Sequence, residues 1–123
     1  VFGSNLAGLH GRGAAKTAFL KFGAKLGQGR GLAGRSFAIA TKDERLAILP
    51  LPVIGAQIAS FLRFAADHPN KRFLVTQIGC GLAGYRPEQI APLFLQFELP
   101  GNVTLPGVFL RVREIEGASS GKA

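Results

Sequence analysis

Four glycines within the first thirteen residues constrain the fold of this chain more than any other feature. They are Gly3, Gly8, Gly11 and Gly13. Glycine loses more backbone entropy on folding than any other residue, so this density needs a reason. One reason is that the backbone approaches a ligand closely. A glycine-rich turn that opens a helix also directs free N–H groups toward an anion. The stretch therefore predicts a phosphate-binding loop, and a flexible loop with a helix cap is the alternative.

The segments on either side of this stretch agree with that interpretation. Val1 and Phe2 are typical of the end of a strand, and residues 14–25 carry apolar side chains at helical spacing. Asn5 supplies a short side-chain amide that is suited to a hydroxyl or amide of a ligand. A strand, a glycine-rich turn and a helix are therefore expected in that order.

Strands and helices are predicted to alternate along the rest of the chain. Strands are expected over residues 36–40, 72–78 and 103–113, and helices over 53–67 and from Pro87 to Phe94. The apolar run at 72–78 indicates a strand covered on both faces. Residues 27–34 are expected to form a mobile loop over the site, although they contain a formal GxGxxG. This order predicts an α/β fold with a mainly parallel sheet.

The composition limits the classes of protein that remain. A chain of 123 residues with 47% apolar residues fits one globular domain, which we place at residues 1–116, followed by a flexible tail at 117–123. The longest apolar runs fall short of a membrane span, so no membrane partner is expected. The net charge of +8 favours anionic partners such as nucleotides or nucleic acid.

The single cysteine, Cys80, excludes an internal disulfide and leaves too few thiols for a zinc finger. It fits a reducing compartment, so a cytoplasmic location is predicted. No metal site and no cofactor are expected. No leader segment is visible, although the chain begins at Val1 and not at a methionine.

Three loops are predicted to follow strands, at residues 3–13, 41–45 and 79–84. Ligands of open α/β sheets bind beyond the carboxyl ends of the strands. If the three strands are near neighbours in a parallel sheet, these loops meet at one edge. The two glycine-rich loops would then enclose a diphosphate between their backbone N–H groups.

The second loop also allows a dinucleotide-binding interpretation. Gly79-Cys-Gly-Leu-Ala-Gly84 is a GxGxxG placed between a strand and a helix. A Rossmann site requires an acidic residue about 20 positions further on, at the end of the next strand. Position 104 holds Thr104, so this alternative is the weaker one.

The two loops together resemble those of macrodomains, the ADP-ribose-binding modules. The segments that carry the resemblance are Asn5-Leu-Ala-Gly-Leu-His-Gly-Arg-Gly-Ala-Ala15 and Gln77-Ile-Gly-Cys-Gly-Leu-Ala-Gly-Tyr85. The resemblance spans residues 1–97 and is greatest to the branch of terminal ADP-ribose and DNA-ADP-ribosyl glycohydrolases. It implies a three-layer α/β fold, with helices on both faces of a mixed, mainly parallel sheet.

The resemblance also implies roles by position. Asn5 would bind the distal ribose. In the glycohydrolase branch a lysine at the end of a middle strand carries catalysis, and Ile39-Ala-Thr-Lys42 resembles that segment, which nominates Lys42. A surface lysine in a turn is the alternative. The remaining predicted ligand contacts are His10, Gly11, Gly13, Ala14, Gly79, Cys80, Gly81, Leu82, Ala83 and Tyr85.

The sequence leaves open whether the chain turns over its ligand. Some members of the branch carry an acid where this chain has Ala83, whereas the antitoxin-like members lack it too. Asp43 is a candidate to orient Lys42, and Glu88 is interpreted as a partner of a helix dipole. Three functions therefore remain: a glycohydrolase acting on ADP-ribosylated nucleic acid or protein, a non-catalytic sensor of ADP-ribose or a related nucleotide, and a basic nucleic-acid-binding domain.

Overall fold

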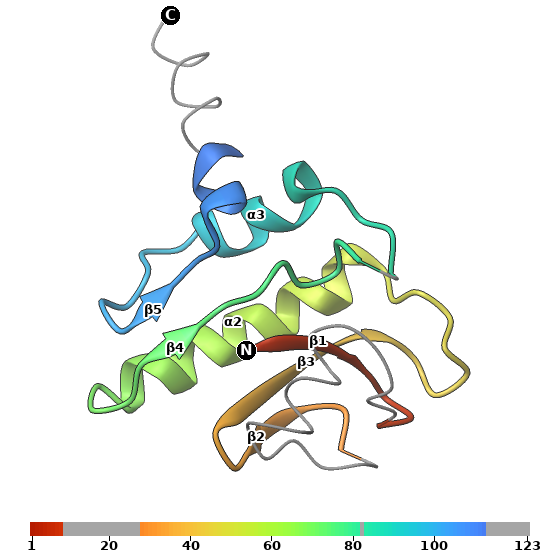
Figure 1. Ribbon diagram of the computed structural model, residues 1–123, viewed down its shortest axis with the longest axis horizontal. Helices are drawn as coiled ribbons and strands as arrows, with labels where there is room; N and C mark the ends of the chain where they lie inside the picture. Colours follow the sequence, from red (N-terminus) through yellow and green to blue (C-terminus); the bar gives the residue numbers. More distant parts are fainter. Residues whose placement is uncertain (9–27, 82, 113–123) are drawn as a thin grey trace, which may run out of the picture.

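The computed structural model describes residues 1–8, 28–81 and 83–112, and every structural statement below concerns these residues. The predicted helix at 14–25 and the predicted tail at 117–123 lie outside them. The elements are β1 (Phe2–Asn5), β2 (Gly31–Ala33), β3 (Ser36–Lys42), α2 (Leu51–Asp67), β4 (Phe73–Leu74), α3 (Pro87–Leu95) and β5 (Val103–Thr104) (Figure 1).

The central strand of the main sheet is β3, which has β1 on one side and β2 on the other. β1 runs parallel to β3, and the register pairs Phe2 with Ala38 and Asn5 with Lys42. β2 runs antiparallel to β3 and is joined to it by a tight turn, because Ala33 pairs with Ser36. The carboxyl ends of β1 and β3 therefore lie side by side.

β4 and β5 form a separate parallel pair, and hydrogen bonds connect this pair to β1. The nitrogen of Val1 donates to the carbonyl of Leu74 over 2.8 Å, and the N–H of Thr76 donates to the carbonyl of Val1 over 3.0 Å. This pattern is that of a parallel ladder. The structure is thus of the predicted α/β class, with two small sheets in which β1–β3 and β4–β5 are parallel and β2–β3 is antiparallel.

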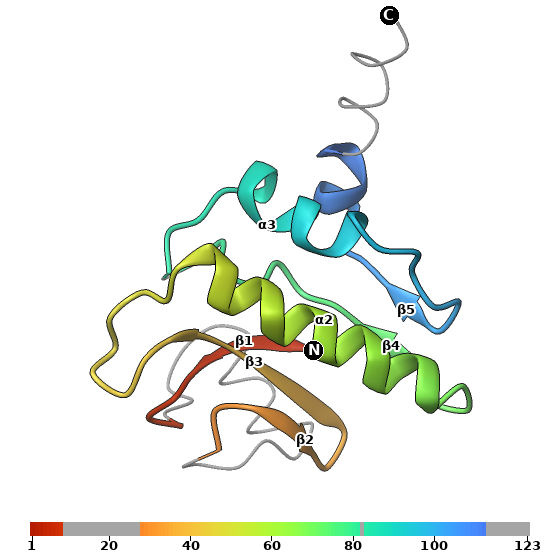
Figure 2. The same cartoon turned by 180° about the vertical axis from the view of Figure 1, so that it is seen from behind.

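α2 forms the centre of the hydrophobic core. A helix was predicted at 53–67, and its apolar residues at helical spacing are buried: Ile54, Ile58, Phe61, Leu62 and Ala65. The helix begins at Leu51, two residues before the predicted start, and Pro52 lies in its first turn, where a missing N–H removes no helical bond. It packs against β3 and against α3, and Figure 2 shows it in front of the strands.

Residues 72–78 were predicted to form a strand covered on both faces, and this predicted burial was wrong. Regular β-structure covers only Phe73 and Leu74, and burial alternates beyond it, with Phe73 and Val75 buried and Leu74 73% exposed. One face of this segment packs into the core around α2, while the other is open at Leu74. The apolar run therefore belongs to a strand covered on one face.

The predicted strand at 103–113 was also wrong beyond Thr104. β5 ends there, and residues 107–112 are helical, with the N–H of Phe109 donating to the carbonyl of Pro106. Phe109 and Val112 are buried at helical spacing, while Leu110 is partly exposed. Pro106 explains the change, because a proline is tolerated just before the first turn of a helix and interrupts a strand.

Residues 27–34 were predicted as a loop over the site, and their described part corrects this. Residues 31–33 form β2, an integral strand of the main sheet, and Gly29 is buried. A Cβ at Gly29 would overlap the carbonyl group of Asn5, so this glycine permits the segment to cross closely beside β1. The formal GxGxxG at 29–34 thus serves packing and a hairpin turn.

Candidate functional site

The carboxyl ends of β1 and β3 lie side by side, and the segment that follows β4 runs beside β1. Asn5 and Lys42 are paired in register, and the N–H of Leu6 donates to the carbonyl of Lys42 over 2.9 Å. The segment that follows β4 arrives at the same place, because a Cβ at Gly3 would lie 3.4 Å from the nitrogen of Gly79. In Figure 1 the three chain segments that leave β1, β3 and β4 all lie at the right.

The described part of the first loop begins with a turn. The N–H of Gly8 donates to the carbonyl of Asn5 over 3.0 Å. The hydroxyl of Ser4 donates to the carbonyl of Gly29, which fixes the end of β1 against the segment that precedes β2. Asn5 is half-buried at the carboxyl end of β1. The predicted ligand contacts His10, Gly11, Gly13 and Ala14 lie outside the described residues.

The second loop is built from three consecutive turns. The N–H of Cys80 donates to the carbonyl of Gln77, that of Gly84 to Gly81, and that of Tyr85 to Gly79, over 3.1, 3.0 and 2.8 Å. These turns use the amide of Cys80 within the loop. The amides of Gly79, Gly81 and Ala83 take no part in them, and the predicted contact Leu82 lies outside the description. Among these three residues Gly81 is exposed, whereas Gly79 and Ala83 are buried.

Gly79 occupies a position that only glycine fits. Its φ is +77°, in the left-handed region that side chains disfavour. A Cβ there would also lie 3.0 Å from the Cδ1 of Ile90 in α3. The loop therefore turns sharply between the last core residue, Ile78, and the start of α3.

Tyr85 ties the second loop to the segment that follows β3. Its hydroxyl donates to the carbonyl of Leu49 over 2.6 Å, and the N–H of Leu49 donates to the carbonyl of Thr41 over 2.8 Å. The side chain is half-buried. Tyr85 was predicted as a ligand contact, and its bond to Leu49 was not anticipated, because a bond to a backbone carbonyl leaves no mark in the sequence.

Lys42 ends β3 and is half-buried, whereas the adjacent carboxylate is engaged in a turn. One oxygen of Asp43 accepts the N–H groups of Arg45 and Ala47 over 2.8 and 3.0 Å. The N–H of Asp43 in turn donates to the carbonyl of Ala47. Asp43 therefore shapes the turn after Lys42, a role that the sequence analysis, which proposed Asp43 as a residue that orients Lys42, did not anticipate.

Gln57 is a residue of the site region that sequence reasoning missed. It is buried in α2, and its side-chain amide forms two 2.8 Å hydrogen bonds with the N–H and the carbonyl of Ala40. These backbone groups lie beyond the end of β2, so Gln57 replaces a neighbouring strand. A polar residue within the apolar stripe of α2 was the available signal.

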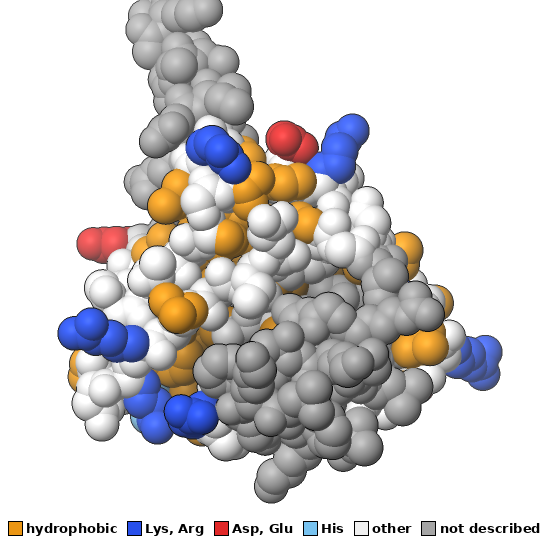
Figure 3. All heavy atoms as spheres, viewed as in Figure 1, with side chains coloured by type: hydrophobic (Ala, Val, Ile, Leu, Met, Phe, Trp, Pro, Cys, Tyr) orange, Lys and Arg blue, Asp and Glu red, His pale blue; other side chains and the backbone are white. Residues whose placement is uncertain are grey.

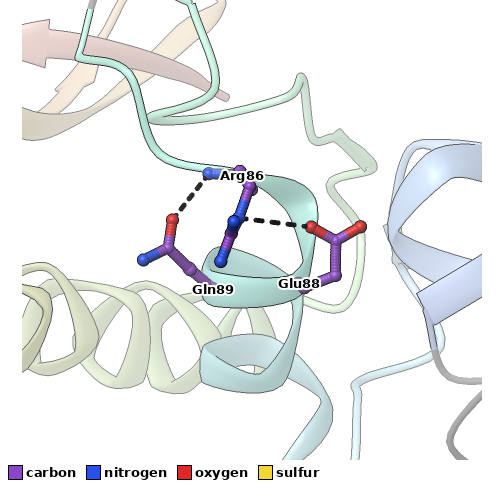
Figure 4. Close-up of polar contacts among 3 residues, drawn as sticks. All are labelled: Arg86, Glu88 and Gln89. Carbon is purple, nitrogen blue, oxygen red and sulfur yellow. Dashed lines mark hydrogen bonds and ion pairs between the residues drawn. The ribbon is translucent and has the colours of Figure 1, made fainter.

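Glu88 lies in the first turn of α3, as a partner for the helix dipole should. Its Oε2 is 3.8 Å from the Nε of Arg86, and both side chains are largely exposed, so this pair contributes little to stability (Figure 4). The N–H of Arg86 donates to the side chain of Gln89 over 2.9 Å, which caps the helix.

Cys80 has the environment of a protonated thiol. Burial, with a smaller contribution from the charge of Glu88, raises the pKa of Cys80. Its Sγ lies 3.6 Å from the carbonyl oxygen of Ile78. A nucleophilic cysteine needs a lowered pKa, so this geometry favours the expected small packing residue over a nucleophile.

Two further properties concern the described residues only. They contain no group of three or more His, Cys, Asp or Glu side chains placed to hold a metal ion. None of the helices in the described ranges is long and apolar enough to cross a membrane.

Comparisons of the chain with protein-family models, with curated proteins and with solved structures give no match. Thr104, at the position where a Rossmann site needs an acid, lies at the end of β5 and is exposed.

Proposed function

We propose that this protein is a macrodomain-like module, with a three-layer α/β fold, that binds ADP-ribose or a related nucleotide. The observation that carries the proposal is the meeting of three loops at one edge of the sheet. Asn5 is paired with Lys42 in register, and Gly3 of β1 lies against Gly79 of the second loop. The first glycine-rich segment thus starts beside the candidate lysine, and the second starts beside the strand that carries Asn5.

The proposed binding mode uses the backbone for the phosphates and side chains for the sugar. Asn5 binds the distal ribose, and the loop amides around Gly79 to Ala83 bind the diphosphate. Backbone N–H groups suit a diphosphate because they remain hydrogen-bond donors at every working pH and are held in place by the fold. The turns of the second loop support this mode, since none of their three hydrogen bonds uses the amide of Gly81 as donor.

The proposed reaction is removal of ADP-ribose from a modified nucleic acid or protein, with Lys42 as the catalytic residue. Two roles fit a lysine here. Its neutral amine adds to C1 of the opened ribose, the acceptor leaves C1 with the electron pair of its bond and takes a proton, and water then frees C1 from the lysine. Alternatively, its ammonium stabilises the negative charge on the acceptor as the bond to C1 breaks. The position of Lys42 at the end of a central strand, opposite Asn5, supports either role.

The test compares Lys42→Ala with Lys71→Ala on a panel of ADP-ribosylated DNA and protein substrates. Lys71 is exposed near the other end of α2, so it controls for loss of a positive charge. We expect Lys42→Ala to lose nearly all hydrolysis and Lys71→Ala to retain it. Equal rates for both variants and the parent would remove the catalytic proposal.

A non-catalytic sensor is the second candidate, and two observations favour it. Ala83 stands where some glycohydrolases carry an acid, and the carboxylate of Asp43 is used by its own turn. Calorimetry would then show ADP-ribose binding in the micromolar range with no product. Absence of binding at millimolar ADP-ribose would exclude both candidates.

A further inference from the structure

One residue of β3 has no counterpart on β1. The two parallel strands pair one for one as far as Ser4, which lies opposite Ala40, and the next residue of β1, Asn5, lies opposite Lys42. Thr41 is therefore an extra residue at the carboxyl end of β3, and this two-against-one pairing defines a β-bulge. With one-for-one pairing throughout, Asn5 would lie opposite Thr41. The bulge thus decides which residue of β3 lies opposite Asn5.

The side chain of Thr41 joins the two strands at this step in register. Its hydroxyl donates to the carbonyl of Ser4 over 3.2 Å, and Ser4 is the last residue of β1 before the step. Its methyl carbon lies 3.6 Å from the point that a Cβ on Gly3 would occupy, which is an ordinary van der Waals distance. Only 5% of Thr41 is exposed, so this hydrogen bond is sheltered from water. The side chain therefore holds the extra residue against β1.

The backbone around the bulge forms hydrogen bonds of its own. The carbonyl of Thr41 accepts the N–H of Leu49 over 2.8 Å, and Lys42 forms an antiparallel bridge with Ile48. Beyond the bulge, the N–H of Leu6 donates to the carbonyl of Lys42 over 2.9 Å, which continues the shifted register. These bonds use backbone groups, which a substitution leaves in place. The hydroxyl of Thr41 is therefore a contact across the bulge that a substitution can remove by itself.

We infer that Thr41 is a positioning residue, whose hydroxyl holds the bulge that sets Lys42 opposite Asn5. β-Bulges are frequent next to active sites, where they redirect a side chain. The consequence for hydrolysis rests on the proposed function, in which Lys42 acts on the ribose that Asn5 binds. A displacement of about 1 Å between reacting groups can slow a reaction roughly a hundredfold. Loss of the bulge geometry therefore slows the chemical step, while the loop contacts to the diphosphate stay in place.

Two substitutions at Thr41 separate the hydroxyl from the rest of the side chain. Thr41→Val removes the hydroxyl and keeps the branched shape that strands favour. Thr41→Ser keeps the hydroxyl and removes the methyl group. Thr76→Val is the matched control, because the hydroxyl of Thr76 donates to the carbonyl of Val1 over 2.9 Å. It removes the same kind of hydrogen bond at the amino end of β1, whereas Lys42 lies beside the carboxyl end.

The first measurement is steady-state hydrolysis of the substrate in the ADP-ribosylated panel that the parent cleaves fastest. Thr41→Val is expected to lower kcat by roughly tenfold or more with KM unchanged. Thr41→Ser and Thr76→Val are expected to stay within about threefold of the parent. A role in stability alone would leave kcat per folded molecule unchanged, so the split between kcat and KM distinguishes positioning from stabilisation.

The second measurement, hydrogen exchange of the Leu6 amide, does not require hydrolysis. This amide is bonded to Lys42 just beyond the bulge, so Thr41→Val should speed its exchange severalfold and the other two variants should preserve it. Equal kcat and equal exchange for Thr41→Val and Thr76→Val overturn the inference, as does a Thr41→Ser variant that is as slow as Thr41→Val. A parent that cleaves no substrate, together with faster Leu6 exchange in Thr41→Val alone, supports the inference about the bulge and overturns the proposed reaction.

Discussion

The side-chain amide of Gln57 forms hydrogen bonds with both backbone polar groups of Ala40, each 2.8 Å long. β2 pairs with β3 only as far as Ala38, so the outer edge of β3 lacks a strand partner at Ala40. Gln57 supplies the missing donor and acceptor from α2. This contact therefore fixes the helix against the strand two residues before Lys42.

Replacing Gln57 with leucine should destabilise the fold by about 2 to 4 kcal/mol, because a buried N–H and a buried carbonyl each lose a partner. Urea denaturation measures the change in free energy of unfolding. Gln96→Ala, at an exposed glutamine after α3, serves as the control and should stay near the parent. Equal unfolding midpoints for the two variants would contradict the conclusion that Gln57 replaces a neighbouring strand at Ala40.

Two glycines of the second loop should respond differently to alanine. Gly79→Ala should cost about 1 to 3 kcal/mol, since Gly79 has a φ of +77° and a Cβ would crowd Ile90. Gly81→Ala should leave stability nearly unchanged, because a Cβ there meets nothing within 4 Å. If Gly81 lies against the diphosphate as proposed, Gly81→Ala should nevertheless weaken ADP-ribose binding in calorimetry. Unchanged affinity with unchanged stability would argue against a phosphate at this loop.

Asn102 should not tolerate aspartate. Its side-chain nitrogen lies within 2.8 to 3.0 Å of the carbonyl oxygens of Ala65, His68 and Lys71, which joins the end of α2 to the chain before β5. Asn102→Ala loses these bonds and should cost about 1 to 2 kcal/mol. Asn102→Asp should cost more at pH 7, because it places a carboxylate among three carbonyls. Thermal and urea unfolding provide the comparison.

The penalty for Asn102→Asp should depend on pH. The three carbonyls disfavour the charged form, so the introduced carboxyl should have a folded-state pKa above the ordinary value of about 3.9. Stability is then retained below the ordinary pKa and is lost as the pH rises through the raised one. The difference between the aspartate and alanine variants should therefore shrink near pH 4. A difference that is independent of pH would contradict this explanation.

Cys80 should react slowly with iodoacetamide at neutral pH. Burial and the charge of Glu88 raise the pKa of the thiol, and only the thiolate reacts. The pH at which alkylation reaches half its maximal rate should therefore be higher in the folded protein than in the same chain unfolded in guanidinium. Glu88→Gln should lower this midpoint only in part, since burial is the larger cause. As Cys80 is the single cysteine, the signal has one source.

The local pattern predicted those elements whose stability comes mainly from one apolar stripe. The stripe from Ile54 to Ala65 identified α2, and Pro87 identified the start of α3, because periodicity and proline geometry act within a few residues. The same reasoning placed a strand at residues 103–113, where Val108, Leu110 and Val112 alternate. The helix at 107–112 buries Phe109 and Val112 instead, and only packing against α3, where Phe94 meets Phe109, distinguishes the two.

At the candidate site, the sequence alone predicted that the two glycine-rich loops bind phosphate and nominated Lys42 as the catalytic residue, since motifs and residue types are local properties. Only the tertiary structure decided that Asn5 is paired with Lys42 and that Gly3 lies against Gly79. It also decided that Tyr85 and Leu49 join two loops. Figure 3 shows Lys and Arg side chains at several separate places on one face of the molecule. These relationships connect residues that are tens of positions apart in the chain. Strand order and register set the distances between them, and sequence periodicity encodes neither.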